Sequence, residues 1–181
     1  MRNTVTTLYG ALDNSAPTIL PSLARFAFAA VLAPYYWASA VTKVDGAGLS
    51  VNGYAQIFPR AMEAVNYDPS QLGLLHSVIV AGGTLAELLL PALLILGLLT
   101  RPAALGMIGF IVVQSLTDLF GHGALGDGVT LGALFDRAPD SVILDQRLLW
   151  LTLLATCVFL GPGPLSLDRL ARRRSGQSQT A

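Results

Sequence analysis

One carboxylate lies in the middle of a long apolar segment. Residues 81–100 read AGGTLAELLLPALLILGLLT, and Glu87 is the single charged residue among them. An acidic side chain at the centre of a bilayer costs about 2.5–3.5 kcal/mol on insertion scales. It must therefore face the interior of a helix bundle and find a partner there. Such a residue either locks helices together or relays protons, and both roles remain open for Glu87.

Further polar and aromatic side chains lie in the neighbouring apolar segments, toward the end of each segment that is predicted to face outward. They are Tyr36, Trp37, Lys43, His76, Gln114, Asp118 and His122. His76 falls on the helical face of Glu87, and the last three recur one turn apart on another segment. This spacing predicts a polar funnel that is closed at its inner end by Glu87. We take Glu87 as the candidate catalytic residue, a proton relay, and the others as candidate ligand-binding residues.

The aromatic residues and the lysine also have a purely structural interpretation. Tyr36 and Trp37, together with Tyr35, are typical of the aromatic belt at a membrane interface. Lys43 follows the same segment and is placed to snorkel toward water. The sequence leaves both interpretations open beside a binding role.

The histidines and the cysteine give little support for a metal or haem. Asp118 and His122 have the i, i+4 spacing that holds a metal, but His76 is the only other histidine, so a hydrogen-bonded pair is favoured. Cys157 is the single cysteine, which excludes an intrachain disulfide and covalent c-type haem. We predict no metal site and no cofactor held within the chain.

The apolar residues around these side chains form four long segments. Of the 181 residues, 53% are hydrophobic and 12% are charged, whereas a soluble domain carries about twice that share of charge. A membrane-spanning helix needs about 20 mainly apolar residues. The sequence therefore predicts an all-α, four-transmembrane-helix bundle with two polar loops on the outer side. The predicted spans are 20–42, 73–100, 102–121 and 145–161.

Basic residues set the orientation of these spans. The arginines that flank the spans on one side are Arg2, Arg25, Arg101, Arg169, Arg172, Arg173 and Arg174. The opposite side carries the acidic loops 43–72 and 122–144, in which 53–65 and 129–135 predict short helices, the first of them broken at Pro59. The positive-inside rule then indicates a multi-pass inner-membrane protein with both termini in the cytoplasm. Residues 1–19 would be a cytoplasmic tail, 20–168 the membrane domain, and 169–181 a basic, disordered tail.

The charge pattern also limits the partners. The net charge is zero and the basic residues form no stripe with interleaved aromatics, which argues against nucleic acid. Four spans without an internal repeat argue against a monomeric solute transporter. The lipid bilayer is the predicted partner, and a homo-oligomer remains open.

Several of these features together resemble the DoxX family of small bacterial membrane proteins. The features are Arg25 opening the first span, Lys43 closing it, Glu87, the hairpin LGLLTRPAALG at 96–106 and GPGPLSLD at 161–168. The resemblance covers about residues 23–170, with Pro164 where the family usually carries a basic residue. It implies a four-helix bundle associated with quinone-linked or sulfur-linked redox systems.

Two functions follow as hypotheses. In the first, the chain is a subunit or helper of such a redox system, with other membrane or periplasmic redox proteins as partners and a quinone as the ligand. Tyr36 and Trp37 would flank the quinone ring, and Lys43 or His76 would donate to its carbonyl. In the second, the chain is a non-enzymatic scaffold or assembly factor for a partner protein or for an exported metal- or thiol-handling system. No catalytic motif complete in itself is present.

Overall fold

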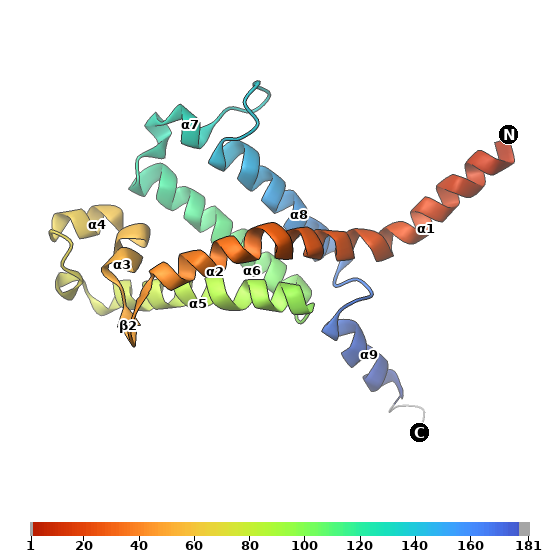
Figure 1. The fold of residues 1–181 in the computed structure, drawn as a ribbon, viewed down its shortest axis with the longest axis horizontal. Helices are drawn as coiled ribbons and strands as arrows, with labels where there is room; N and C mark the ends of the chain where they lie inside the picture. Colours follow the sequence, from red (N-terminus) through yellow and green to blue (C-terminus); the bar gives the residue numbers. More distant parts are fainter. Residues whose placement is uncertain (1, 178–181) are drawn as a thin grey trace.

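The computed structural model describes residues 2–177 and is almost entirely helical (Figure 1). Within these residues, four helical segments are long and apolar enough to cross a membrane: Thr4–Thr42, Leu74–Leu96, Thr100–Gly121 and Val142–Leu160. The predicted all-α fold with four spans is thus confirmed, and the protein is a multi-pass membrane protein.

The first, third and fourth spans each contain a π-helical segment. The first consists of α1 (Arg2–Ala27), the π segment η1 (Phe28–Leu32) and α2 (Ala33–Thr42). The second is α5 (Leu74–Leu96). The third joins α6 (Thr100–Leu116) to η3 (Thr117–Gly121), and the fourth joins η5 (Val142–Gln146) to α8 (Arg147–Leu160). A π-helical turn accommodates an extra residue and so rotates whatever follows it around the helix axis.

The loops between spans contain short elements. After the first span come the antiparallel strands β1 (Val44–Asp45) and β2 (Gly48–Leu49), then α3 (Val51–Ile57), α4 (Pro59–Ala64) and the 3-10 turn η2 (Pro69–Gln71). The loop before the fourth span holds η4 (Ala124–Gly126) and α7 (Gly128–Leu131). Both predicted loop helices are therefore present, and the break predicted at Pro59 separates α3 from α4. The chain continues past the fourth span into α9 (Leu167–Gln177).

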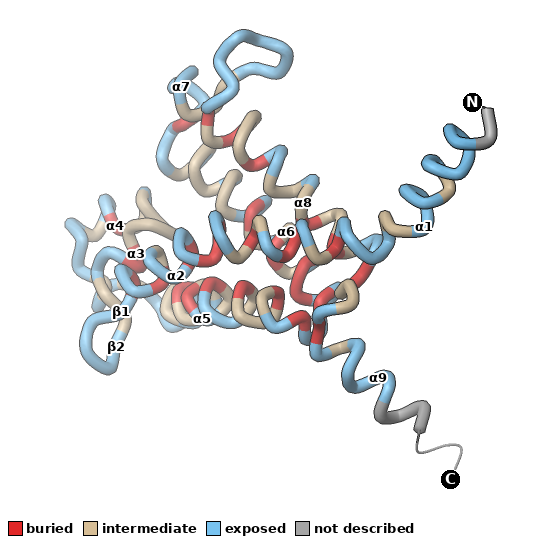
Figure 2. Tube along the Cα trace, turned by 45° about the vertical axis from the view of Figure 1, so that its right-hand side comes forward, coloured by how far each residue is buried: buried red, intermediate tan, exposed pale blue. Residues whose placement is uncertain are grey.

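The spans pack in a closed ring. α2 contacts α5, α5 contacts α6, α6 contacts α8, and α8 returns to α1. Figures 1 and 2 show that α2 and α5 run together and diverge from α6 and α8 toward the end that carries the loops. The ring is therefore tight at the end near α9 and wider at the other end.

Buried apolar side chains fill the tight part of the ring, where Figure 2 shows most of the buried residues. The main core includes Phe28, Tyr36, Leu94, Met107 and Leu154. A smaller core of Tyr54, Met62 and Val80 lies beneath the first loop. Large apolar side chains are also exposed along the spans, which suits helices that face lipid rather than water.

The two ends of the chain differ from the prediction. Residues 1–19 were predicted as a tail apart from the first span, but α1 is continuous from Arg2 and its first half projects from the bundle in Figure 1. The disordered tail predicted from residue 169 is helical as far as Gln177, because Ser166 caps α9 by accepting from the Arg169 amide at 3.2 Å. The side chain of Arg174 and residues 178–181 lie outside the described part.

Candidate functional site

Glu87 forms a salt bridge in the interior of the bundle. The Nζ atom of Lys43 lies 3.0 Å from Oε1 and 2.9 Å from Oε2 of Glu87. Ser39 completes the group, because its hydroxyl lies 2.6 Å from Nζ and 3.2 Å from Oε1. Lys43 and Glu87 are each 3% exposed. The two charges therefore compensate each other out of contact with solvent.

The direction of the lysine side chain excludes the snorkelling interpretation. Lys43 follows the last residue of α2, yet its ammonium lies beside Ser39, one helical turn back into the span. Snorkelling would carry the ammonium the other way, toward water. Glu87 attracts it inward because an unpaired carboxylate at this depth is far more costly than a paired one. The snorkelling interpretation is wrong, and Glu87 has the bundle partner that its depth requires.

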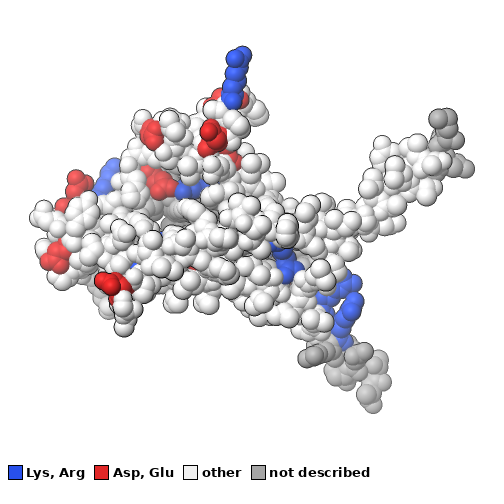
Figure 3. Space-filling model, viewed as in Figure 1, with Lys and Arg blue, Asp and Glu red and all other residues white. Residues whose placement is uncertain are grey.

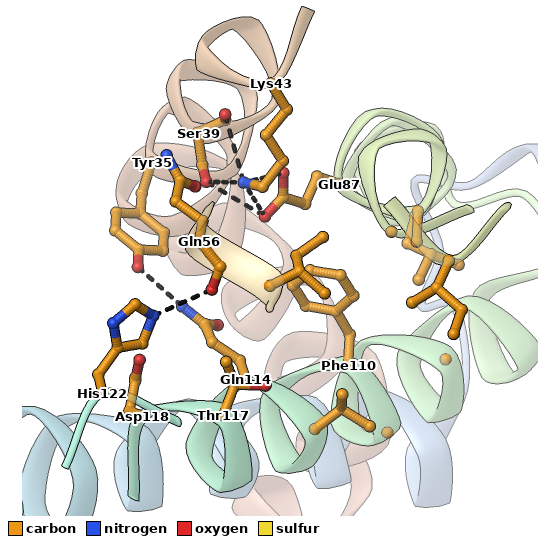
Figure 4. A pocket seen from close by; sticks show the side chains of 18 residues that line it. Tyr35, Ser39, Lys43, Gln56, Glu87, Phe110, Gln114, Thr117, Asp118 and His122 are labelled. Carbon is orange, nitrogen blue, oxygen red and sulfur yellow. Dashed lines mark hydrogen bonds and ion pairs between the residues drawn. The ribbon is translucent and has the colours of Figure 1, made fainter. Parts of the chain in front are cut away.

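The salt bridge forms part of the wall of a cavity of about 390 Å³ between α2, α5 and α6 (Figure 4). Leu90, Phe110 and Val113 give it apolar walls, and Gly83, Gly106 and Gly109 leave room for it. This volume is within the range of pockets that hold small organic ligands. The cavity lies where the two pairs of helices diverge.

Polar groups gather in one part of this cavity, apart from the salt bridge. The Tyr35 hydroxyl accepts from Nε2 of Gln114 at 3.0 Å, and Nε2 of His122 lies 3.0 Å from the carbonyl oxygen of Gln56. Figure 4 shows these side chains, with Asp118, converging from different elements. Oε1 of Gln114 is buried and has no hydrogen-bond partner within residues 2–177. The cavity thus joins apolar walls to a cluster of hydrogen-bonding groups.

Five of the eight predicted site residues line the cavity: Lys43, Glu87, Gln114, Asp118 and His122. The structure brings them together from three of the four spans. Their roles as ligands or as a relay remain predictions.

The other three predicted residues are placed elsewhere. Tyr36 is fully buried in the main core. Its ring packs edge-on against the rings of Phe110 and Trp150, with distances between ring centroids of 5.7 and 6.5 Å. Trp37 donates from Nε1 to the Leu88 carbonyl at 3.2 Å, and the His76 ring packs edge-on against Phe58 beneath the first loop. None of the three is among the residues that line the cavity. The structure therefore places Tyr36, Trp37 and His76 apart from this cavity, and their roles beside a ligand remain predictions.

Asp118 and His122 do not form the predicted pair within the described residues. Asp118 instead accepts from Nη2 of Arg147 at 2.5 Å, while His122 contacts Gln56. Nη1 of Arg147 donates to the Ser115 hydroxyl at 3.0 Å. Arg147 is 3% exposed, so a second charge pair is held within the spans, between η3 and α8.

Comparison with models of protein families identifies the family to which this membrane protein belongs. The model described as DoxX matches residues 21–118, which is more than half of the chain. The chain belongs to the DoxX family. No curated protein and no solved structure matches it. The matched residues include both members of the Lys43–Glu87 salt bridge, whereas Arg147 lies beyond them.

In this DoxX protein, Arg25 ties together the tight end of the ring. Its guanidinium donates to the carbonyls of Leu94 and Ile95 at the end of α5, at 2.8 and 2.5 Å. It also donates to those of Pro162 and Leu165 after α8, at 2.8 and 2.6 Å. One buried arginine thus satisfies carbonyl oxygens at the end of α5 and in the turn after α8, and the Leu94 carbonyl also accepts from the Gly97 amide at 3.2 Å. Arg25 thus joins the hairpin and GPGPLSLD features of the resemblance.

Asp168 completes this junction from α9. Its carboxylate accepts from the Leu99 amide at 2.8 Å and from both the amide and the hydroxyl of Thr100 at 2.9 Å. Burial opposes ionisation, but these hydrogen bonds outweigh it and lower the pKa of Asp168. Gly97, at φ +64°, gives α5 its left-handed end beside these contacts. The residues behind the family resemblance at this end are therefore structural.

Tyr35 and Arg147 are site residues that the sequence pattern did not single out. Tyr35 was grouped with its neighbours as an aromatic belt, and the rotation of α2 decides which of the three faces the cavity. Arg147 could have been found, because it is a charge inside an apolar segment and must therefore have an acidic partner. It lies near the acidic loops rather than among the flanking arginines that set the orientation.

Within the described residues, no three side chains of His, Cys, Asp or Glu gather where they could hold a metal ion. The cavity offers His122 and Asp118 as its nearest approach to such a set, and Asp118 already pairs with Arg147. What the cavity presents to a ligand is therefore hydrogen bonding and apolar contact.

Proposed function

We propose that this DoxX protein is an inner-membrane subunit or helper of a quinone-linked or sulfur-linked redox system, and that its cavity binds a quinone head group. The observation that carries the proposal is the cavity between α2, α5 and α6, with apolar walls and a polar cluster formed around Tyr35 and Gln114. A quinone ring has apolar faces and carbonyl acceptors at its edge, so it matches such a lining.

The Tyr35 hydroxyl is the donor that suits a ring carbonyl. It accepts from Gln114, and within residues 2–177 its own proton has no acceptor. Lys43 is less suited to this role, because its three protons are matched by both oxygens of Glu87 and the hydroxyl of Ser39. We therefore assign ring recognition to Tyr35 and Gln114.

Glu87 is proposed as the group that exchanges protons with the bound ring. Quinone chemistry couples electron transfer to proton transfer, which needs an acid or base beside the ring. Glu87 lines the cavity, where it is paired with Lys43. The electrons would be exchanged with a partner protein in the membrane or on its outer face. Both termini would lie in the cytoplasm and the cavity would face outward, as the flanking arginines suggest.

A binding titration tests this proposal. A short-chain quinone is titrated into protein in mild detergent, and binding is followed by calorimetry. Gly109→Leu would fill the cavity, because Gly109 lines it and has open space at its Cβ position. Gly82→Leu is the matched control, since Gly82 also has open space but does not line the cavity. We expect the first variant to lose at least tenfold in affinity and the second to bind normally. Absence of binding to the unaltered protein would refute the proposal.

A second candidate is the non-enzymatic scaffold or assembly factor. It is favoured by the way Lys43, Glu87 and Ser39 satisfy one another, as a purely structural lock would. If this candidate holds, a partner is recovered from gently solubilised membranes while quinone does not bind, and Gly109→Leu leaves partner recovery unchanged.

A further inference from the structure

A second pocket lies at the opposite end of the molecule from the cavity. It has a volume of about 250 Å³ and is lined by residues from three elements: Pro17, Leu160, Pro162, Gly163, Arg169 and Arg172. It lies where α8 ends, beside α1 and beneath α9. The proposed function makes no use of it.

The two arginines of this pocket are held on one face of α9. Arg169 and Arg172 are three residues apart, so their side chains stand one above the other. Asp168, the acid beside Arg169, directs both oxygens to the start of α6. Within the described residues, neither guanidinium has a hydrogen bond or an ion pair, and both side chains are exposed. The pocket therefore presents two exposed positive charges that form no salt bridge, although the carboxylate of Asp168 attracts Arg172 at longer range.

The other residues that line the pocket are apolar or glycine. Pro162 is fixed through its carbonyl by Arg25, and Leu160 is the last residue of α8. Beside it, Phe159 and Leu165 are 78% and 80% exposed. Figure 3 shows basic side chains gathered over α9 and the adjoining end of the bundle, next to an uncharged surface along the spans. A positive pocket that continues into an apolar, lipid-facing surface matches a molecule with a negative head and an apolar chain.

We propose that this pocket binds the phosphate of an anionic phospholipid, with Arg169 and Arg172 as the donors and Leu160 against the start of an acyl chain. Guanidinium groups match phosphate oxygens in charge and in planar geometry. The pocket lies at the depth where a helix leaves the bilayer, which is where lipid phosphates are found. In the orientation proposed above, this is the cytoplasmic leaflet, whose anionic lipids attract basic residues near helix ends.

The test uses the full-length protein in nanodiscs made either of phosphatidylcholine alone or with added phosphatidylglycerol. Retained lipid is measured by native mass spectrometry, and thermal unfolding confirms that each variant is folded. Arg169→Gln and Arg172→Gln each remove a charge from the pocket. Arg173→Gln is the matched control, because Arg173 is an exposed neighbour on α9 that does not line the pocket. A parallel titration with inorganic phosphate separates a lipid site from a site for a soluble anion.

We expect the unaltered protein to retain phosphatidylglycerol in preference to phosphatidylcholine. Each pocket variant should lose about fivefold in affinity, and Arg173→Gln should lose much less. An equal loss in all three variants would mean diffuse attraction to the membrane surface and would overturn the site. A lack of preference in the unaltered protein would also overturn it. Stabilisation by inorganic phosphate to the same extent would overturn the assignment to lipid.

Discussion

Breaking the Lys43–Glu87 salt bridge from one side should destabilise the bundle more than removing it altogether. In Glu87→Leu, the ammonium of Lys43 keeps only the hydroxyl and carbonyl oxygens of Ser39, at 2.6 and 3.4 Å. In Lys43→Met, the carboxylate keeps only the Ser39 hydroxyl at 3.2 Å. Each single change leaves an uncompensated charge at a position that is 3% exposed, at a cost of about 3–5 kcal/mol.

The double variant removes both charges and places apolar side chains of similar volume in their stead. Replacing a whole buried pair in this way is often neutral or stabilising by about 1–4 kcal/mol. The two single costs of about 3–5 kcal/mol each add to at least about 6 kcal/mol, so the two substitutions should couple by about 6 kcal/mol or more. That is well above the limit of additivity for independent sites. In equilibrium terms, each single variant unfolds about a hundredfold or more readily than the double variant.

Reversible unfolding by SDS in mixed micelles is followed by circular dichroism. It gives the free energy of unfolding of the unaltered protein, of each single variant and of the double variant. Arg137→Met serves as a control for the loss of an exposed charge and should change the free energy of unfolding by less than about 0.5 kcal/mol. If the effects of Glu87→Leu and Lys43→Met simply add, or if each is below about 1 kcal/mol, the buried salt bridge is not what holds α2 to α5. Quinone binding by a folded double variant, combined with a loss of proton-coupled activity, would assign the relay role to the Lys43–Glu87 pair as well.

Three further outcomes follow from the structure. Cys157 is buried and should not react in cysteine-accessibility labelling, so an introduced cysteine reports on its own side of the membrane. Arg173→Cys should react only with reagent added on the cytoplasmic side, and Arg137→Cys only with reagent added outside. The reverse pattern would overturn the orientation. The folded-state pKa of Asp168 is lowered, so its stabilising effect is present above its unfolded pKa of about 3.9 and is lost as the pH falls through the folded value. Asp168→Asn should therefore lower the denaturation midpoint at pH 7 and flatten the acid limb of the stability profile, whereas an unchanged acid limb would contradict this. Gly97→Ala should cost at least about 1–2 kcal/mol by chemical denaturation, because it strains a left-handed residue and brings a methyl carbon within 2.7 Å of two side chains. Normal stability of that variant would show that the side chains of Arg25 and Ser166 can shift at little energetic cost.

The sequence by itself determined the features that depend on neighbouring residues. The runs of apolar residues predicted four spans, and the break at Pro59 and the hairpin before α6 were located because turn and cap signals act over a few positions. Glu87 could also be singled out, because the cost of a charge at membrane depth is independent of the details of the fold. The same reasoning required a partner for Glu87 without indicating which residue it would be.

Only the tertiary structure decided the partners. Lys43 is 44 positions from Glu87, and Arg147 is 29 positions from Asp118. Whether such residues meet depends on how each helix is rotated, since successive residues differ by about 100° around the axis. The π-helical segment at Phe28–Leu32 shifts that rotation just before the aromatic residues, so Tyr35 lines the cavity and Tyr36 is buried in the core. Hydropathy reports the depth of a residue in the membrane, whereas the face that it presents is set by packing against the other three spans.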